Sequence, residues 1–214
     1  LDPVKLDAAL NKKALSTALL MHANGPLSHA PTKATFSKCW SSTGSLAASR
    51  SNLYLSSGYG GDLAPSTGAR AIVGYMTDDG PGNLAVGHRR WILNPATRVM
   101  ATGSTSRANA LTVVGTKTSS KAAQPAYLEW PAKGWFPTQL EPQGRWSISS
   151  SKRSVSFAKA KVKVQRVNAK GKVLGKQSVT VHKVQDGYGP NTLVFTVKGV
   201  KAPKGKKTVR YKVT

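Results

Sequence analysis

The stretch that decides the fold is Gly87-His88-Arg89-Arg90-Trp91-Ile92-Leu93-Asn94-Pro95. It predicts a helix over 85–93 that ends at the Asn-Pro pair, because the residue before a proline disfavours helical backbone. A histidine that follows a glycine at the head of a helix has one side of its ring exposed. His88 is therefore a candidate for binding a ligand.

A second histidine, His29, lies in the loop after a predicted N-terminal helix. We expect this helix to start at Asp2-Pro3, an N-cap followed by proline at the first helical position, and to run to Ala23. Asn24-Gly25-Pro26 should end it, because glycine supplies a left-handed cap and proline does not continue a helix. Two neutral imidazoles brought together across a cleft form half of a site for Zn²⁺ or another borderline metal. The alternative is that each histidine makes only structural hydrogen bonds, since their separation in the sequence does not fix a distance.

Short elements surround the two histidines. Residues 69–76 predict a helix, and 78–83 predict a loop from their turn chemistry. Residues 99–103 and 110–114 predict strands, and 52–55 is either a short strand or the start of a helix. These predicted helices and strands indicate an α+β fold.

The composition changes near residue 120. The stretch 129–137 places aromatic residues among prolines and indicates a rigid connector. Beyond Trp146, valines alternate with polar residues, which predicts a small antiparallel β-domain with one polar face. We therefore expect a first domain over 1–120, a connector over 121–146 and a basic β-domain over 147–214.

Most of the positive charge lies in the C-terminal part. The formal net charge is +24, with 12 Lys+Arg against 5 Asp+Glu in residues 1–120 and 20 against 3 in residues 121–214. Such a field attracts polyanions, including nucleic acid, anionic cell-wall polymer and acidic membrane surfaces. Charge alone does not choose among them.

Three further features bear on the compartment. The chain has no run of about 18 apolar residues, so we expect no transmembrane segment. Its single cysteine, Cys39, excludes an internal disulfide and is expected to be a small buried residue. The chain begins at Leu1 rather than at methionine, so we expect a longer product whose signal segment has been removed or trimmed.

Several segments follow one another in the order known from a family. They are Leu27-Ser28-His29, Ser51-Asn52-Leu53, Ala71-Ile72-Val73-Gly74-Tyr75-Met76, the stretch Gly87–Pro95 and Thr102-Gly103. Over roughly residues 3–115 the chain resembles the CAP superfamily (cysteine-rich secretory, antigen 5 and pathogenesis-related 1 proteins) in its bacterial, disulfide-free form. The resemblance implies a CAP-type α–β–α sandwich whose central cleft holds two histidines and two acidic residues, followed here by the small antiparallel β-domain.

The resemblance also implies site residues. It places the two histidines of the family at His29 and His88, and one acidic residue at Asp78. Where the family has a glutamate, this chain has Ser51, and serine does not act as a general base at neutral pH without an activating partner. The expected cleft residues are His29, Ser51, Asn52, Asp78, His88 and Arg89. His29, His88 and Asp78 are the expected ligands of a divalent cation, Zn²⁺ first, with water in an open position.

Three functions are compatible with these features. The first is a secreted or cell-surface protein whose cleft binds a divalent cation and a small ligand or peptide, while the basic β-domain holds it to anionic surface polymer. The second is a metal-dependent hydrolase that uses the same cleft, which the serine at position 51 disfavours. The third is a charge-driven nucleic-acid-binding protein, which needs exposed stacking aromatics beside its basic patch. We expect no such pairing here, because most aromatics lie in the connector or alternate inward on strands. No catalytic residue is assigned.

Overall fold

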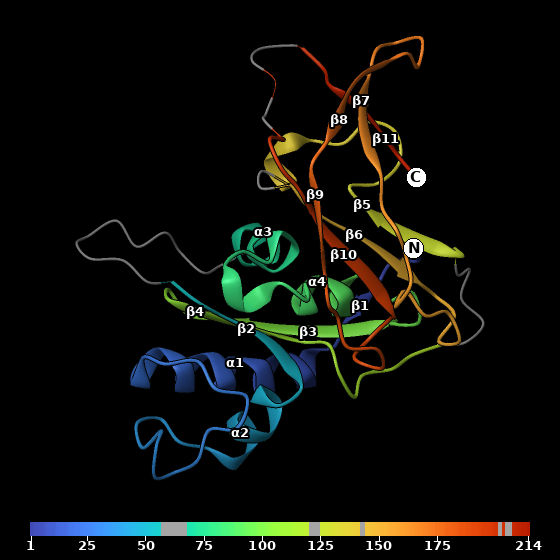
Figure 1. The fold of residues 1–214 in the computed structure, drawn as a ribbon. Helices are drawn as coiled ribbons and strands as arrows, with labels where there is room; N and C mark the ends of the chain where they lie inside the picture. Colours follow the sequence, from blue (N-terminus) through green and yellow to red (C-terminus); the bar gives the residue numbers. More distant parts are fainter. Residues whose placement is uncertain (57–67, 120–124, 142–143, 201–202, 204–206) are drawn as a thin grey trace. The chain divides into compact units, whose positions relative to one another are not determined.

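The computed structural model describes residues 1–56, 68–119, 125–141, 144–200, 203 and 207–214 (Figure 1). The chain is a mixed α+β protein, and its described residues form four α-helices and three sheets whose strands are mostly antiparallel. It divides into two compact units. The first comprises Leu1–Met76 and Asn94–Gln124, and the second comprises Thr77–Leu93 and Pro125–Thr214.

The first unit is built on a four-stranded sheet in the order β1-β3-β4-β2. Its strands are β1 (Lys5–Leu6), β2 (Ser51–Leu55), β3 (Val99–Ser104) and β4 (Ala108–Thr112), and β1 pairs with β3 in parallel while the other pairs are antiparallel. Helices α1 (Ala8–Asn24) and α2 (Ser42–Ala48) lie on one side of the sheet in Figure 1, and α3 (Ala69–Thr77) lies on the other.

Small residues let α1 approach the sheet closely. A Cβ on Gly103 of β3 would lie 2.1 Å from the backbone nitrogen of Leu15, so only glycine fits there. The hydrophobic core of the first unit contains residues from α1, α2, β2 and β4, together with one phenylalanine from the loop after α1. These residues are Ala14, Ala18, Leu20, Met21, Phe36, Ala48, Leu53, Ala108 and Ala110.

The second unit contains two antiparallel sheets. One has the order β5-β6-β10-β9, from Tyr127–Trp130, Arg145–Ser150, Thr192–Val197 and Val179–His182. The other has the order β11-β7-β8, from Arg210–Val213, Val164–Val167 and Val173–Gln177. Trp146, Val164, Leu193, Phe195 and Val197 form their shared core. Helix α4 (Gly87–Ile92) and two 3₁₀ turns, η1 (Pro81–Asn83) and η2 (Thr138–Leu140), also belong to this unit.

The N-terminal helix begins later than expected. Its N-cap is Asp7, whose carboxylate accepts from the backbone nitrogen of Leu10 at 2.8 Å. The Asp2-Pro3 pair does not start the helix, because the residues after it pair with β3 as a strand. The predicted end is confirmed, since Gly25 follows the helix with a φ of 95°.

Other expectations meet the structure in different ways. Residues 52–55 are a strand, and the helix expected over 85–93 begins at Gly87 because Val86 has a left-handed φ of 45°. The connector expected over 121–146 contains β5, which pairs with β6. Cys39 is exposed rather than buried, because it lies in a turn at a φ of 54°. Among the described residues, no helix has the length and hydropathy that a membrane crossing requires.

Candidate functional site

His88 and Asp78 form a hydrogen-bonded pair at the head of α4. The His88 Nδ1 and the Asp78 Oδ1 are 2.6 Å apart, and the second carboxylate oxygen accepts from the backbone nitrogen of Arg89 at 3.2 Å. The Asp78 side chain is fully buried, whereas a quarter of the His88 side chain is exposed. The pair thus holds one edge of the imidazole in the interior and leaves part of the ring at the surface.

The chain reaches this geometry through two left-handed residues. Asp78 has a φ of 54°, a conformation that aspartate tolerates better than most residues. Val86 has a φ of 45°, which redirects the backbone into α4 directly before the Gly-His pair. A Cβ on Gly87 would lie 3.2 Å from the Tyr188 ring, so the glycine at the helix head also makes room for an aromatic neighbour.

The Asp78 carboxylate fixes the tautomer of His88. An ionised carboxylate only accepts hydrogen bonds, so Nδ1 carries the proton and donates it. In the neutral ring the lone pair then lies on Nε2, and any ligand that binds the ring end-on must meet that nitrogen. Histidines that bind metals are commonly held in this way, with the other ring nitrogen donating to a carboxylate or a carbonyl.

Below the pair lies a buried network of charged groups. The Arg89 guanidinium donates to Glu141 Oε2 at 3.0 Å and to the Arg145 carbonyl at 2.9 Å, and the Arg145 guanidinium donates to the Asp78 carbonyl. Glu141 also accepts from the Arg145 backbone nitrogen at 2.9 Å. Burial lowers the pKa of Arg89 to about 10, with the Glu141 and Asp78 carboxylates acting in the opposite direction, so the guanidinium stays charged at neutral pH.

Arg89 is therefore a supporting residue of the site. Only 1% of it is exposed, and its guanidinium lies 5.5 Å from the centre of the Trp130 ring. The resemblance places Arg89 in the cleft, and the structure places it behind Asp78. Glu141 and Arg145 were missed from the sequence, because they lie more than 50 residues from Arg89 and no local pattern links them.

Arg90 joins the same helix to the loop before β10. Its guanidinium donates to the carbonyls of Gln185 and Pro190 at 3.1 Å each. The Tyr188 ring lies 5.8 Å from that guanidinium, and it also packs edge-on against Trp91. Burial lowers the pKa of Arg90, while Asp186 raises it. Both arginines of the decisive stretch thus bind carbonyls of the second unit.

His29 has comparable local geometry in the first unit. Its Nδ1 lies 3.0 Å from the carbonyl oxygen of Ala48, at the end of α2. A carbonyl can only accept, so Nδ1 again carries the proton and the lone pair of the neutral ring lies on Nε2. The residue as a whole is exposed.

Ser51 and Asn52 are structural residues at the start of β2. The Ser51 hydroxyl donates to the Ala47 carbonyl at 2.8 Å, so the 3.0 Å contact with Thr112 is one in which threonine donates. The Asn52 carbonyl accepts from the Tyr75 hydroxyl at 3.1 Å. Both residues are at least 95% buried. The Ser51 proton is directed at a carbonyl, which is not a base that could activate it.

The six expected cleft residues are divided between the units. His29, Ser51 and Asn52 belong to the first unit, and Asp78, His88 and Arg89 belong to the second, where they are in direct contact. No three His, Cys, Asp or Glu side chains gather into a metal-binding group among the residues that the structure describes. The Asp78 side chain is fully buried and its two oxygens accept from His88 and from the backbone of Arg89, and its part as a direct metal ligand stays a prediction. It fits as the group that orients His88.

Comparisons with known proteins leave the family open. No family model, no curated protein and no solved structure matches the chain. The resemblance of the decisive stretch to the CAP superfamily therefore stays a prediction.

The second unit also presents a basic face on its three-stranded sheet. Lys212 of β11, Gln165 of β7 and Lys176 of β8 stand side by side in the strand register. Val164 and Tyr211 face the core, so the residues that alternate with them, Arg210 among them, face solvent. Neighbouring strands lie about 4.8 Å apart, which places the two lysines about 10 Å apart.

An exposed tryptophan borders this face. Trp135 is 78% exposed, and the Arg210 guanidinium lies 5.9 Å from the centre of its ring. The sequence led us to expect no stacking aromatic beside a basic patch, and that expectation was wrong. The error arose because Trp135 lies among prolines, which indicated that it packs in a connector.

Proposed function

We propose that this chain is a secreted or cell-surface protein of the CAP type, in which His88, oriented by Asp78, binds a divalent cation, with His29 as the second ligand that the resemblance implies. The basic β-sheet face holds the protein to an anionic surface polymer. The observation that carries the proposal is the 2.6 Å contact between the His88 ring and a fully buried carboxylate. The layering of the first unit, with α1 and α2 on one side of a sheet and α3 on the other, supports the CAP-type α–β–α sandwich.

The donor set matches the chemistry of zinc. Neutral imidazole nitrogen is a preferred ligand of Zn²⁺, and a carboxylate behind the ring makes the outer nitrogen more basic and fixes its direction. Asp78 supplies that carboxylate for His88, and the Ala48 carbonyl plays the corresponding part for His29. When bound, the cation would polarise a carbonyl or phosphoryl oxygen of a small ligand or peptide.

Calorimetric titration of Zn²⁺ at pH 7.5 tests the metal proposal, because unperturbed histidines are neutral there. We expect saturable one-to-one binding that is weakened in His29→Ala and in His88→Ala and abolished in the double variant. His182→Ala is the matched control, since that histidine lies on β9 and hydrogen-bonds Thr196. If His29→Ala binds Zn²⁺ with wild-type affinity, His29 is not a ligand. If the wild type shows no saturable binding, the proposed metal site is wrong.

A metal-dependent hydrolase is the second candidate. The observation that favours it is again the Asp78-His88 pair, because an imidazole held by a carboxylate is suited to ligate Zn²⁺, which would lower the pKa of a water bound to it. A Ser51 nucleophile does not fit, since its hydroxyl is buried between Ala47 and Thr112. Zn²⁺-dependent turnover of an ester or peptide that disappears in His88→Ala would favour the hydrolase over a binding protein.

The polymer part of the proposal rests on the basic face and Trp135. Cations spaced about 7 Å along β11 and about 10 Å across the sheet can each meet a different charge of a linear polyanion. The exposed Trp135 ring offers a stacking surface for a sugar or a base. A nucleic acid would use the same features, so poly(glycerol phosphate), single-stranded DNA and duplex DNA should be compared at one ionic strength. Tighter binding of either DNA would favour nucleic-acid binding over attachment to surface polymer.

A further inference from the structure

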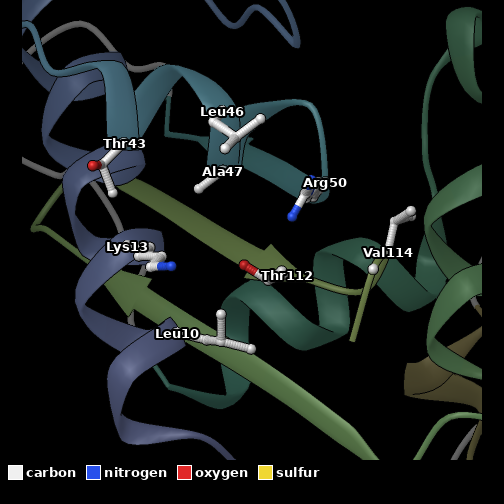
Figure 2. Close-up of a pocket in the computed structure, with 9 residues that line it drawn as sticks. Leu10, Lys13, Thr43, Leu46, Ala47, Arg50, Thr112 and Val114 are labelled. Carbon is white, nitrogen blue, oxygen red and sulfur yellow. The ribbon is translucent and has the colours of Figure 1, made fainter. Parts of the chain in front are cut away.

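A pocket of about 100 Å³ opens between α1, the end of α2 and the end of β4 in the first unit (Figure 2). Two of its lining residues are cationic, Lys13 from α1 and Arg50 from the turn after α2. Figure 2 shows their nitrogen atoms reaching from opposite sides toward the space in front of Thr112. The rest of the wall is mainly apolar and consists of Leu10, Leu46, Ala47, Val114 and Gly115, with Thr43 at the edge.

No acidic residue described as lining the pocket neutralises its two cations. The nine residues described as lining it include no aspartate or glutamate, and within the described part of the chain neither Lys13 nor Arg50 forms an ion pair. Two positive charges that face one space repel each other, so an anion between them is attracted by both. The pocket therefore selects for negative charge.

The backbone that carries Arg50 is fixed. Its carbonyl accepts from the backbone nitrogens of Val113 and Val114 at 2.9 and 3.1 Å, and its own nitrogen donates to Ala47. A Cβ on Gly115 would lie 3.6 Å from the Arg50 Cδ, so the side chain runs along this turn. A side chain whose stem is held in place loses less conformational freedom on binding than a free one.

Thr112 offers the pocket an acceptor rather than a donor. Ser51 donates to Ala47, Thr112 donates to Ser51, and the hydroxyl proton of Thr112 is thereby used. Its oxygen points into the pocket in Figure 2, and the residue is 5% exposed. The anion is therefore held by the two cations, and Thr112 lies beside it without donating to it.

From these features we infer that the pocket binds a small organic phosphate, with the phosphate between Lys13 and Arg50 and a short apolar group against Leu10 and Leu46. A phosphomonoester carries a charge of about −1.5 to −2 at pH 7, which matches the two cations. Arginine binds phosphate oxygens in pairs and lysine binds them as a point charge. A carboxylate, with one charge, would leave one of the two cations uncompensated.

Calorimetric titration with monobutyl phosphate, inorganic phosphate and butyrate tests the inference on the full chain. We expect monobutyl phosphate to bind most tightly and butyrate to bind at least tenfold more weakly. Lys13→Ala and Arg50→Ala should each weaken monobutyl phosphate at least tenfold. The matched control is Lys12→Ala, an exposed lysine next to Lys13 on α1 that does not line the pocket, which should change the affinity less than twofold.

The apolar wall has its own test. Leu46 is 57% exposed, so Leu46→Ser should leave the fold intact. The substitution should lower the affinity for monobutyl phosphate toward that for inorganic phosphate. The affinity for inorganic phosphate should stay unchanged. Equal losses in Lys12→Ala and Lys13→Ala would show a diffuse positive field instead of a site. Butyrate binding as tight as phosphate binding, or no saturable binding at all, would overturn the inference. Should Arg50→Ala not fold, Arg50→Lys keeps the charge, and a wild-type affinity there would exclude paired recognition by arginine.

Discussion

Asp78 is the residue through which the candidate site is connected to the interior. Its two carboxylate oxygens bind the His88 ring and the Arg89 backbone, and its carbonyl accepts from Arg145. With Glu141 it offsets two buried guanidinium groups. The same carboxylate thus orients the surface imidazole and neutralises charge below it.

We expect Asp78→Asn to destabilise the protein by about 3 kcal/mol, because it leaves buried positive charge without its partner at nearly unchanged volume. Urea unfolding measures the loss. Asp79→Asn is the control, since Asp79 is exposed, and it should change the free energy of unfolding by less than about 0.5 kcal/mol. Equal effects of the two substitutions would contradict the role of the network.

His182 gives a pH dependence of known sign. Burial, together with the nearby Arg145 charge, lowers its pKa in the folded protein below the ordinary value of 6.5. As the pH falls through 6.5 the unfolded chain takes up a proton before the folded one does, so stability is lost toward acid pH. Unfolding free energies between pH 7 and 5 should fall less steeply in His182→Gln than in the wild type, and parallel curves would refute the assignment.

At the scale of elements, α1 shows which parts of the fold are readable from sequence. Its end was predictable because the glycine at position 25 acts locally, through its own left-handed backbone. Its start was not, because Lys5 and Leu6 pair with β3, more than 90 residues away. Strand β5 was hidden for the same reason, since its pairing with β6 outweighs the prolines around it.

The site follows the same division. His88 and Asp78 could be named from the resemblance, and they lie only ten residues apart and are in contact. Glu141 and Arg145 could not be found, because their contacts with Arg89 depend on the packing of distant strands. Residues 57–67, which fall in the Ser/Gly-rich part of the sequence, lie outside the described residues.

The contact between α1 and β3 predicts a steric effect. Gly103→Ala places a Cβ against the backbone of α1, which cannot move aside as a side chain could, so we expect a loss of about 2–3 kcal/mol. Gly175→Ala on β8 is the control, because a Cβ there meets nothing within 4 Å and the φ is not positive. Thermal unfolding should show a lower Tm for the first variant only, and an unchanged Tm would contradict the close approach.

For the whole molecule, the distribution of charge predicts how polymer binding depends on salt. Each phosphate contact contributes about −0.7 to the slope of log K against log salt for a single-stranded polyanion. Replacing Lys176 and Lys212 with glutamine should therefore reduce the magnitude of the slope for poly(glycerol phosphate) by about 1.4. The same change at Lys12 and Lys33, which are exposed in the first unit, should leave the slope near its wild-type value. Equal reductions would show that no particular face binds the polymer.

The second unit is assembled from two separate pieces of chain, Thr77–Leu93 and Pro125–Thr214, with part of the first unit between them. This order matters during biosynthesis. Helix α4 leaves the ribosome before Glu141 and before the carbonyls that receive its arginines, so about 100 residues must still be made before Arg90 reaches Pro190. A fragment that stops near residue 120 would carry these arginines without their acceptors, and we expect it to aggregate or to be degraded. Dividing the protein for study therefore requires a circular permutation or two co-expressed pieces, because no single cut separates the units.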